Sequence, residues 1–126
     1  MLFRSNSCIA VRRDTAEKIT ISLDEITTQS EKLLDDIQEN MYRICEEHNK
    51  KRTSIAHNME EFEKIMNENQ GYVKAMWCGD AECEAKIREK TGAKSRCIPF
   101  EQEHLDDKCV VCGKPAKEMV VWGRQY

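Results

Sequence analysis

The sequence lacks the features that carry a chain into a membrane or out of the cell. No apolar run approaches the roughly 20 residues that a membrane-spanning helix needs. Residues 1–7 contain no apolar core of a secretory signal peptide. The cysteines number seven, and Cys8, Cys45 and Cys97 follow no pairing pattern, which disfavours a secreted disulfide scaffold. We therefore expect a cytoplasmic protein.

The motifs of common catalytic machinery are also missing. There is no glycine-rich phosphate loop, no Gly-x-Ser-x-Gly turn and no His-Glu-x-x-His helix. His48, His57 and His104 are scattered, so each is better explained as a surface or capping residue than as a catalyst. The net charge of −3 disfavours general nucleic-acid binding, although a local basic face remains open. The chain by itself does not predict an enzyme.

What the sequence does contain is two closely spaced cysteine pairs. Cys78 and Cys83 enclose one short turn, and Cys109 and Cys112 enclose a tighter one that Gly113 follows. Two such pairs, far apart in the chain, typically present four thiolates to one tetrahedral zinc ion. Gly113 can adopt the positive φ that closes the second turn. The spacing predicts a structural zinc site, because four sulfur ligands leave no position open for water.

Two other interpretations of the cysteines stay open. Cys109 and Cys112 could form a redox pair, although residues 113–115, Gly-Lys-Pro, argue against the helix that such a pair normally opens. The cysteines could also be unligated buried thiols. His104 lies near the second pair and could replace one thiolate as a ligand, but four well-spaced cysteines make it unnecessary.

Hydrophobic periodicity and capping residues predict an α+β fold. We expect a two-layer α/β sandwich with a mixed sheet in the order β-α-β-α-β-α-β-β, a long N-terminal helix and a four-cysteine zinc site. Ser22, Asn58 and Asp80 are the expected N-caps, and the last of these opens a helix that carries Cys83 in its first turn. The expected strands are 8–13, 19–23, 53–57, 72–77, 93–100 and 117–124, and the expected helices 23–50, 59–70 and 81–90.

The long helix is expected to carry an apolar stripe, made of Ile26, Leu33, Leu34, Ile37, Met41, Ile44 and Cys45. Basic residues stand at its end, at Lys50, Lys51 and Arg52. They either complement the helix dipole as a solvated cap or contact RNA, and the sequence leaves both possibilities open.

Several motifs, in the same order, resemble one family. They are Val-Arg-Arg-Asp-Thr at 11–15, Leu-Leu-Asp-Asp-Ile-Gln-Glu-Asn at 33–40, Met-Glu-Glu-Phe at 59–62, Gly-Tyr-Val-Lys-Ala-Met-Trp-Cys-Gly at 71–79, Gly-Ala-Lys-Ser-Arg-Cys-Ile-Pro-Phe at 92–100 and Trp-Gly-Arg-Gln-Tyr at 122–126. The chain resembles the C-terminal part of prolyl-tRNA synthetase, a class II aminoacyl-tRNA synthetase, in its archaeal and eukaryotic type. The resemblance runs from about residue 9 to the last residue.

The resemblance implies a division of the chain. Residues 1–18 would be a remnant of the last strand of the anticodon-binding domain with a linker, and residues 19–126 the C-terminal zinc-binding domain. The four cysteines Cys78, Cys83, Cys109 and Cys112 fall on the family's zinc-ligand positions. Tyr126 corresponds to the family's last residue, whose terminal carboxylate points toward the active site. Ala16 stands where the family commonly has glycine, so this turn is expected to differ or carry strain.

The resemblance also implies a function. The parent enzyme would be a proline--tRNA ligase that forms prolyl-tRNA with ATP, and this domain would brace the catalytic and anticodon-binding domains. ATP and Mg²⁺ would bind only in the catalytic domain, which is absent from this sequence, so the fragment alone should be inactive. The implied partners are those two domains and tRNA(Pro), and the parent would be a homodimer. The apolar faces would pack on the absent domains.

An alternative is a free-standing module that binds tRNA or another synthetase. Its contacts would be basic residues, namely Arg12, Arg13, Lys50, Lys51, Arg52, Lys86, Arg88, Lys94 and Arg96. A redox protein that uses Cys109 and Cys112 is the remaining alternative.

Overall fold

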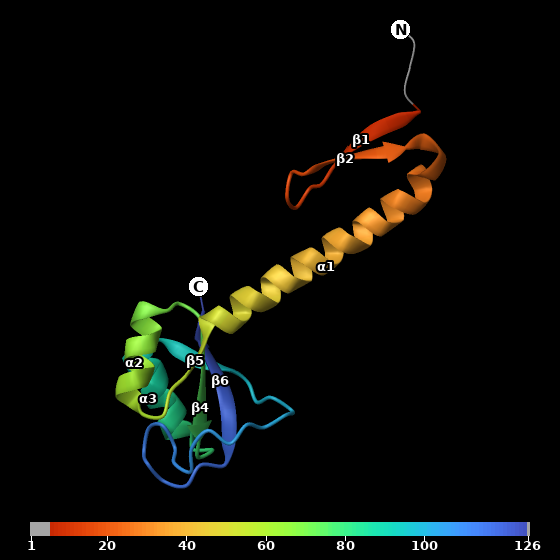
Figure 1. Cartoon of the computed structure of the whole chain (residues 1–126). Coiled ribbons are helices and arrows are strands. Elements are labelled where there is room, and N and C mark those ends of the chain that lie inside the picture. The colour runs from red at the N-terminus through yellow and green to blue at the C-terminus, as the bar shows by residue number, and fades with distance from the viewer. Residues whose placement is uncertain (1–5, 126) are drawn as a thin grey trace. The chain divides into compact units, whose positions relative to one another are not determined.

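The computed structural model, shown in Figure 1, describes residues 6–125. The chain divides into two compact units, Met1–His48 and Asn49–Tyr126. None of the helices within the described range is long and apolar enough to span a lipid bilayer. The division reflects packing, and the domain boundary predicted after residue 18 stays a prediction.

The first unit begins with a β-hairpin. Strands β1 (Ser7–Val11) and β2 (Lys18–Ser22) pair antiparallel, from Ser7 opposite Ser22 to Val11 opposite Lys18. A short 3₁₀ turn, Leu23–Glu25, then leads into helix α1, Ile26–Arg52. Ser22 caps this turn, as predicted, and its Oγ accepts a hydrogen bond from the backbone N–H of Asp24 at 3.4 Å. The α-helix thus starts slightly later than the sequence predicts.

The hairpin turn contains the strained position that the family resemblance implied. Ala16 has φ of +61°, and no other non-glycine residue in the described part of the chain has a positive φ. The turn is closed by the N–H of Arg12 donating to the carbonyl of Glu17 at 2.8 Å, and by the N–H of Ala16 donating to the carbonyl of Arg12 at 3.0 Å. A Cβ in this left-handed region costs about 1–2 kcal/mol, which explains why glycine suits the position.

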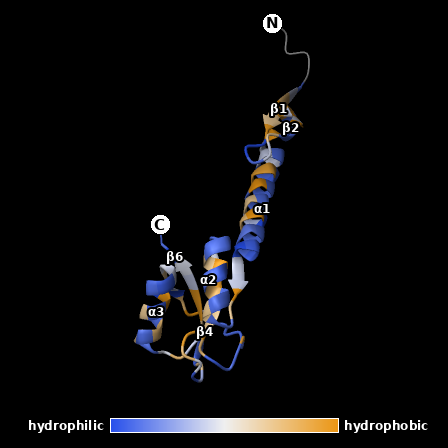
Figure 2. Cartoon of the chain, turned by 90° about the vertical axis from the view of Figure 1, so that its left-hand side faces the viewer, coloured by the Kyte–Doolittle hydropathy of each residue, from blue (hydrophilic) through white to orange (hydrophobic). Residues whose placement is uncertain are grey.

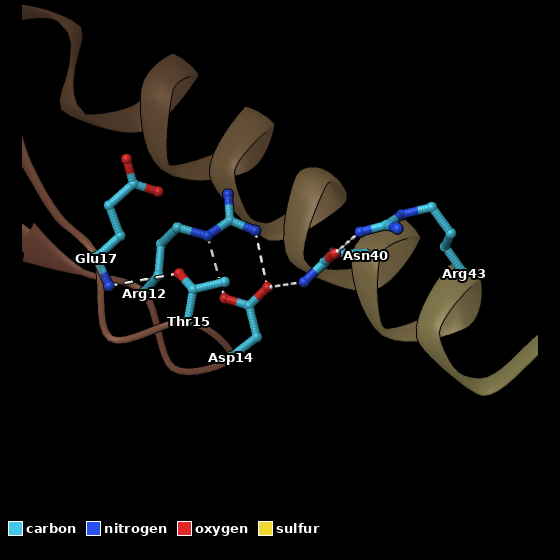
Figure 3. Close-up of polar contacts among 6 residues, drawn as sticks. All are labelled: Arg12, Asp14, Thr15, Glu17, Asn40 and Arg43. Atoms are coloured by element: carbon cyan, nitrogen blue, oxygen red, sulfur yellow. Dashed lines mark hydrogen bonds and ion pairs between the residues drawn. The ribbon is translucent and has the colours of Figure 1, made fainter. Parts of the chain in front are cut away.

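A polar network joins the hairpin to α1, as Figure 3 shows. Arg12 donates to both carboxylate oxygens of Asp14, at 3.1 and 2.8 Å. Asn40 on α1 donates to the same carboxylate at 2.7 Å, and its own amide oxygen accepts from Arg43 at 2.7 Å. The hydrogen bonds from Arg12 and then Asn40 hold the pKa of Asp14 well below its ordinary value. The network therefore fixes the hairpin against the helix.

The second unit is built on a four-stranded mixed sheet in the order β3-β4-β6-β5. Strand β3 runs parallel to β4, and β6 pairs antiparallel with both β4 and β5. The strands are β3 (Thr53–Ile55), β4 (Tyr72–Trp77), β5 (Ala93–Cys97) and β6 (Glu118–Arg124), and the helices are α2 (Met59–Glu68) and α3 (Ala81–Thr91). Figure 1 shows α2 and α3 side by side on one side of β4, β5 and β6. The predicted two-layer fold with a mixed sheet is confirmed.

Two differences from the predicted fold have simple causes. The strand predicted at 93–100 ends at Cys97, since Pro99 lacks the N–H that a continued ladder would need. The two N-terminal strands do not join the main sheet and form a two-stranded sheet of their own. Sequence periodicity identifies strands but does not say which sheet they enter.

Capping residues set the ends of the short helices as predicted. Asn58 Oδ1 accepts from the N–H of Glu61 at 2.9 Å at the start of α2. Asp80 Oδ1 accepts from the N–H of Glu82 at 2.9 Å at the start of α3. Gly92 ends α3 in the left-handed conformation with φ of +71°, which glycine adopts at no steric cost.

The core of this unit lies between the two helices and the sheet. Trp122 of β6 is at its centre and is fully buried, with the rings of Phe62 and Trp77 approaching edge-on at centroid distances of 6.3 and 6.4 Å. Edge-to-face contacts of this kind add about 0.5–1.5 kcal/mol to the burial of each ring. The buried core cluster consists of Ala56, Phe62, Met66, Val73, Ala75, Ile87, Ala93, Val110, Val120 and Trp122. This core fixes the end of β4, from which the candidate site begins.

Candidate metal centre

The first cysteine turn follows directly from the end of β4. Cys78 comes after Trp77, the last residue of the strand, and Gly79 turns the chain with φ of +85°. Asp80 then caps α3, whose first turn carries Cys83. The indole N–H of Trp77 donates to the carbonyl of Asp80 at 3.1 Å, so the turn is fixed to the strand that precedes it.

The second cysteine turn closes on itself through the backbone. The N–H of Cys109 donates to the carbonyl of Lys114 at 2.8 Å, and the N–H of Gly113 donates to the carbonyl of Cys109 at 3.0 Å. Gly113 has φ of +68°, as predicted, and nothing lies within 4 Å of where a Cβ would be. The backbone conformation therefore favours glycine here, and a lack of space does not.

Two further backbone hydrogen bonds dock this turn on the end of β4. The N–H of Val110 donates to the carbonyl of Met76 at 3.0 Å, and the N–H of Lys117 donates to the carbonyl of Trp77 at 2.8 Å. Trp77 and Val111 pack on the cysteines as partly buried hydrophobic neighbours. No sequence pattern marks these two residues as part of the site, although Trp77 directly precedes the first cysteine.

The two turns bring four sulfur atoms together. The Sγ atoms of Cys78, Cys83, Cys109 and Cys112 lie within 4.8 Å of one another. Cys78 Sγ is 3.7 Å from Cys83 Sγ and 3.7 Å from Cys112 Sγ. Bonds of about 2.3 Å to a central zinc place the corners of a tetrahedron about 3.8 Å apart, whereas a disulfide would need about 2.0 Å. The donor set therefore fits a tetrahedral zinc ion.

The environment of the thiols differs across the cluster. Burial raises the pKa of Cys78 and of Cys83, and a cation bound beside them would favour their thiolate forms. Cys112 is exposed, and the backbone N–H of Lys114 lowers the pKa of its thiol to about 7. Metal binding at such a site displaces protons, since only the thiolate is a ligand.

The remaining cysteines and histidines lie outside the cluster. Cys8, Cys45 and Cys97 are free and do not belong to the four-sulfur group. His104 is exposed and pairs through Nε2 with Asp107 Oδ1 at 2.9 Å, so it is not brought to the cysteines as a ligand. Four gathered sulfurs are more than a redox pair requires, which favours the metal interpretation.

The other sequence-predicted residues have different outcomes. His57 pairs through Nδ1 with an Asp106 oxygen at 3.6 Å, which agrees with a surface role. Arg12, one of the candidate RNA contacts, forms a salt bridge with Asp14. Tyr126 lies outside the described residues, so the role of its carboxylate stays a prediction.

Taken together, the fold and the cysteines define an α+β protein with a four-sulfur cluster that could hold a metal ion. Residues 59–126 match the family model described as prolyl-tRNA synthetase, C-terminal. The chain belongs to this family. The resemblance stated from its motifs is thereby confirmed.

Known relatives support the assignment over almost the whole chain. The chain is 48% identical over 122 residues to the proline--tRNA ligase of Clostridium novyi (strain NT). The aligned region covers 97% of this chain and 26% of that ligase. It is 50% identical over 121 residues to the proline--tRNA ligase of Ruminiclostridium cellulolyticum. There the aligned region covers 96% of this chain and 25% of that ligase. The structure of prolyl-tRNA synthetase from Cryptosporidium parvum, complexed with L-proline and AMP, superimposes with a TM-score of 0.88 at 29% identity, over 97% of this chain and 26% of that one.

The chain thus spans about a quarter of the length of the curated relatives it matches. The match lies in their C-terminal region, and the remaining three quarters have no counterpart among these 126 residues. The sequence is therefore a part of a ligase that does not include the catalytic domain, as predicted.

Proposed function

We propose that this chain acts as the C-terminal domain of a proline--tRNA ligase and braces its catalytic and anticodon-binding domains during ATP-dependent prolyl-tRNA formation. The observation that carries the proposal is the exposure of the apolar side chains on α1. This helix of 27 residues has an apolar stripe but buries none of its residues. Leu34 is 65% exposed and Met41 57% exposed. Figure 2 shows hydrophobic residues distributed along the helix among hydrophilic ones.

The stripe includes a shaped surface. A cavity of about 530 Å³ is lined by Ile37, Met41, Ile44 and Cys45, together with three polar residues, Arg13, Asp14 and His48. An apolar centre with polar neighbours is typical of a surface that another protein domain covers. The partner would be the remaining three quarters of the ligase, since this chain matches only about a quarter of the length of its relatives.

Within this role, Cys78, Cys83, Cys109 and Cys112 would hold one structural zinc ion. Bound zinc would link the turn after β4 to the turn before β6 and do no chemistry, since four sulfurs complete its coordination. ATP and Mg²⁺ would bind in the catalytic domain, and tRNA(Pro) would be bound by a parent enzyme that is a cytoplasmic homodimer. Residues 1–18 would belong to the anticodon-binding domain and its linker, and the carboxylate of Tyr126 would point toward the catalytic domain.

The bracing role can be tested in a chimera. The Clostridium novyi ligase, with its own C-terminal region replaced by this chain, would carry Met41→Asp together with Ile44→Asp. Two charges in the covered surface are expected to lower the rate of prolyl-tRNA formation at least about tenfold, and to open the domain junction to limited proteolysis. Tyr42→Asp is the matched control, because Tyr42 is 69% exposed and does not line the cavity.

The outcomes separate clearly. Wild-type aminoacylation and wild-type proteolysis of the double variant would refute bracing through α1. A loss of activity that Tyr42→Asp reproduces would assign the effect to the helix as a whole and not to this surface.

A further inference from the structure

Another cavity, of about 410 Å³, gathers positive charge within the second unit. Arg52, Arg96 and Arg124 line it together with Tyr72, and none of its described lining residues carries a carboxylate. Tyr72 begins β4, whereas Cys78 follows the other end of that strand. At about 3.3 Å per residue the cavity lies roughly 20 Å along the strand from the four cysteines. It is therefore separate from the metal centre.

Two glycines permit close approaches to residues that line this cavity. A Cβ at Gly71 would lie 1.9 Å from the backbone oxygen of Arg52, so only glycine lets the chain pass the end of α1 this closely. A Cβ at Gly123 would lie 3.2 Å from the ring of Tyr72 and 3.5 Å from Nε of Arg96. Glycine at this position of β6 lets the ring and the guanidinium lie directly over the strand.

An irregularity in the sheet places the second arginine. The β5–β6 register shifts between Ser95, which pairs with Trp122, and Cys97, which pairs with Val121. Arg96 is the extra residue at this shift. Bulges of this kind redirect a side chain out of the regular alternation, and here Arg96 donates to the carbonyl of Gly123 at 3.0 Å.

Neutral acceptors orient the three guanidinium groups. Each arginine donates a hydrogen bond to a backbone carbonyl. The acceptors are the carbonyl of Gln70 for Arg52 at 2.6 Å, of Gly123 for Arg96 at 3.0 Å and of Thr91 for Arg124 at 2.6 Å. Carbonyl oxygens fix the geometry but leave the positive charges in place. Each guanidinium has five N–H donors, which exceeds the number that these bonds use.

We propose that this cavity binds the phosphate group of a phosphorylated ligand, either a backbone phosphate of RNA or the phosphate of a free nucleotide. Guanidinium groups match phosphate oxygens bidentately, and three of them converge here on a chain whose net charge is −3. The ring of Tyr72, 46% exposed, offers an aromatic surface for the attached sugar or base. The proposal does not rest on the bracing role, and the four cysteines take no part in the phosphate contacts.

The test uses the whole chain, purified with its metal, and amide NMR signals of Gly71 and Gly123. The chain has five glycines, so these signals are readily assigned. Inorganic phosphate, AMP and a ten-nucleotide single-stranded RNA are titrated separately. Saturable shifts of both glycines with all three probes are expected. RNA binding at least about tenfold tighter than AMP, and weakened by salt, would identify a backbone phosphate as the ligand. Equal affinity for AMP and RNA would identify a free nucleotide.

Variants locate the binding. Arg96→Gln and Arg52→Gln are each expected to weaken phosphate binding about tenfold, by loss of a charge-assisted hydrogen-bonding group. Arg88→Gln is the matched control, because Arg88 is exposed on α3 and does not line the cavity, and its affinity should stay within about twofold of wild type. Thermal melting of each variant establishes that it is folded. No saturable shift with any probe, or equal weakening by Arg88→Gln, would overturn the proposal.

Discussion

Replacing Cys83 by serine tests the metal centre most directly. Cys83 is 3% exposed and sits in the first turn of α3, behind its cap, so the serine side chain occupies nearly the same space. The change removes one sulfur ligand without an obvious steric effect. If a metal holds the two cysteine turns together, Cys83→Ser should cost far more than a conservative substitution normally does.

The expected cost can be compared with the stability of the unit that contains the site. That unit runs from residue 49 to residue 126, and native domains are stable by about 0.05–0.15 kcal/mol per residue, or roughly 4–12 kcal/mol here. A structural zinc ion contributes on the order of 10–16 kcal/mol in small zinc domains near neutral pH. Because the two quantities are similar, loss of the metal should leave this unit without cooperative folding.

The assay combines metal analysis, thiol titration and thermal melting. Wild-type protein should contain one zinc per chain, with three reactive thiols from Cys8, Cys45 and Cys97, and four more should appear together when a chelator is added. Cys83→Ser should lose the zinc and the cooperative melting transition. Cys97→Ser is the control, since Cys97 is exposed and outside the cluster, and it should keep both.

Two results would refute the reasoning. Wild-type protein without metal, in which Cys109 and Cys112 react as an isolated pair, would favour the redox interpretation. A metal-free Cys83→Ser variant that melts as wild type does would show that the hydrophobic core alone holds the two turns.

Three further predictions concern the fold. Ala16→Gly should raise the free energy of unfolding by up to about 1 kcal/mol in urea titrations, because it removes the side chain from a left-handed φ of +61°; unchanged or lower stability would contradict this. Asp14 has its pKa lowered in the folded chain, so its carboxylate stabilises the hairpin above the ordinary pKa of 3.8 and this contribution is lost as the pH falls further; its ¹³C carboxyl signal should therefore show no titration step near pH 3.8, and a step there would refute the Arg12 bond. Phe62→Ala should cost about 3–5 kcal/mol in the same urea titrations, since Phe62 is fully buried against Trp122, and a cost under about 1 kcal/mol would show that the core refills the space.

Local features of this chain could be predicted because short-range chemistry determines them. Asn58 and Asp80 cap helices because their side-chain oxygens reach N–H groups two or three residues ahead. Gly113 adopts a positive φ because a tight cysteine turn requires it. The four cysteines could be grouped from spacing alone, since each pair is held by its own short turn.

Long-range features could not be predicted in the same way. The last strand, β6, lies between β4 and β5, and no local pattern gives that order. The role of Arg96 depends on a register shift against β6, and that of Arg124 on its position at the end of the same strand. Arg52 and Arg96 are among nine basic residues that the sequence offers as candidate contacts. The sequence does not separate them from Arg88, because only the fold brings particular arginines together.

The two proposed sites lie at opposite ends of β4, and this position determines how each can be tested without the other. The cysteine turns close one end of this strand, and the arginine cavity lies at the other, so both depend on the same sheet. Removing the metal should therefore abolish phosphate binding as well, by unfolding the sheet, and that result would say nothing specific about the arginines. Arg96→Gln tests the cavity alone, because this substitution leaves all four sulfurs and their backbone turns unchanged. A variant that keeps its zinc and its melting temperature but loses phosphate affinity would establish the cavity as a binding site in its own right.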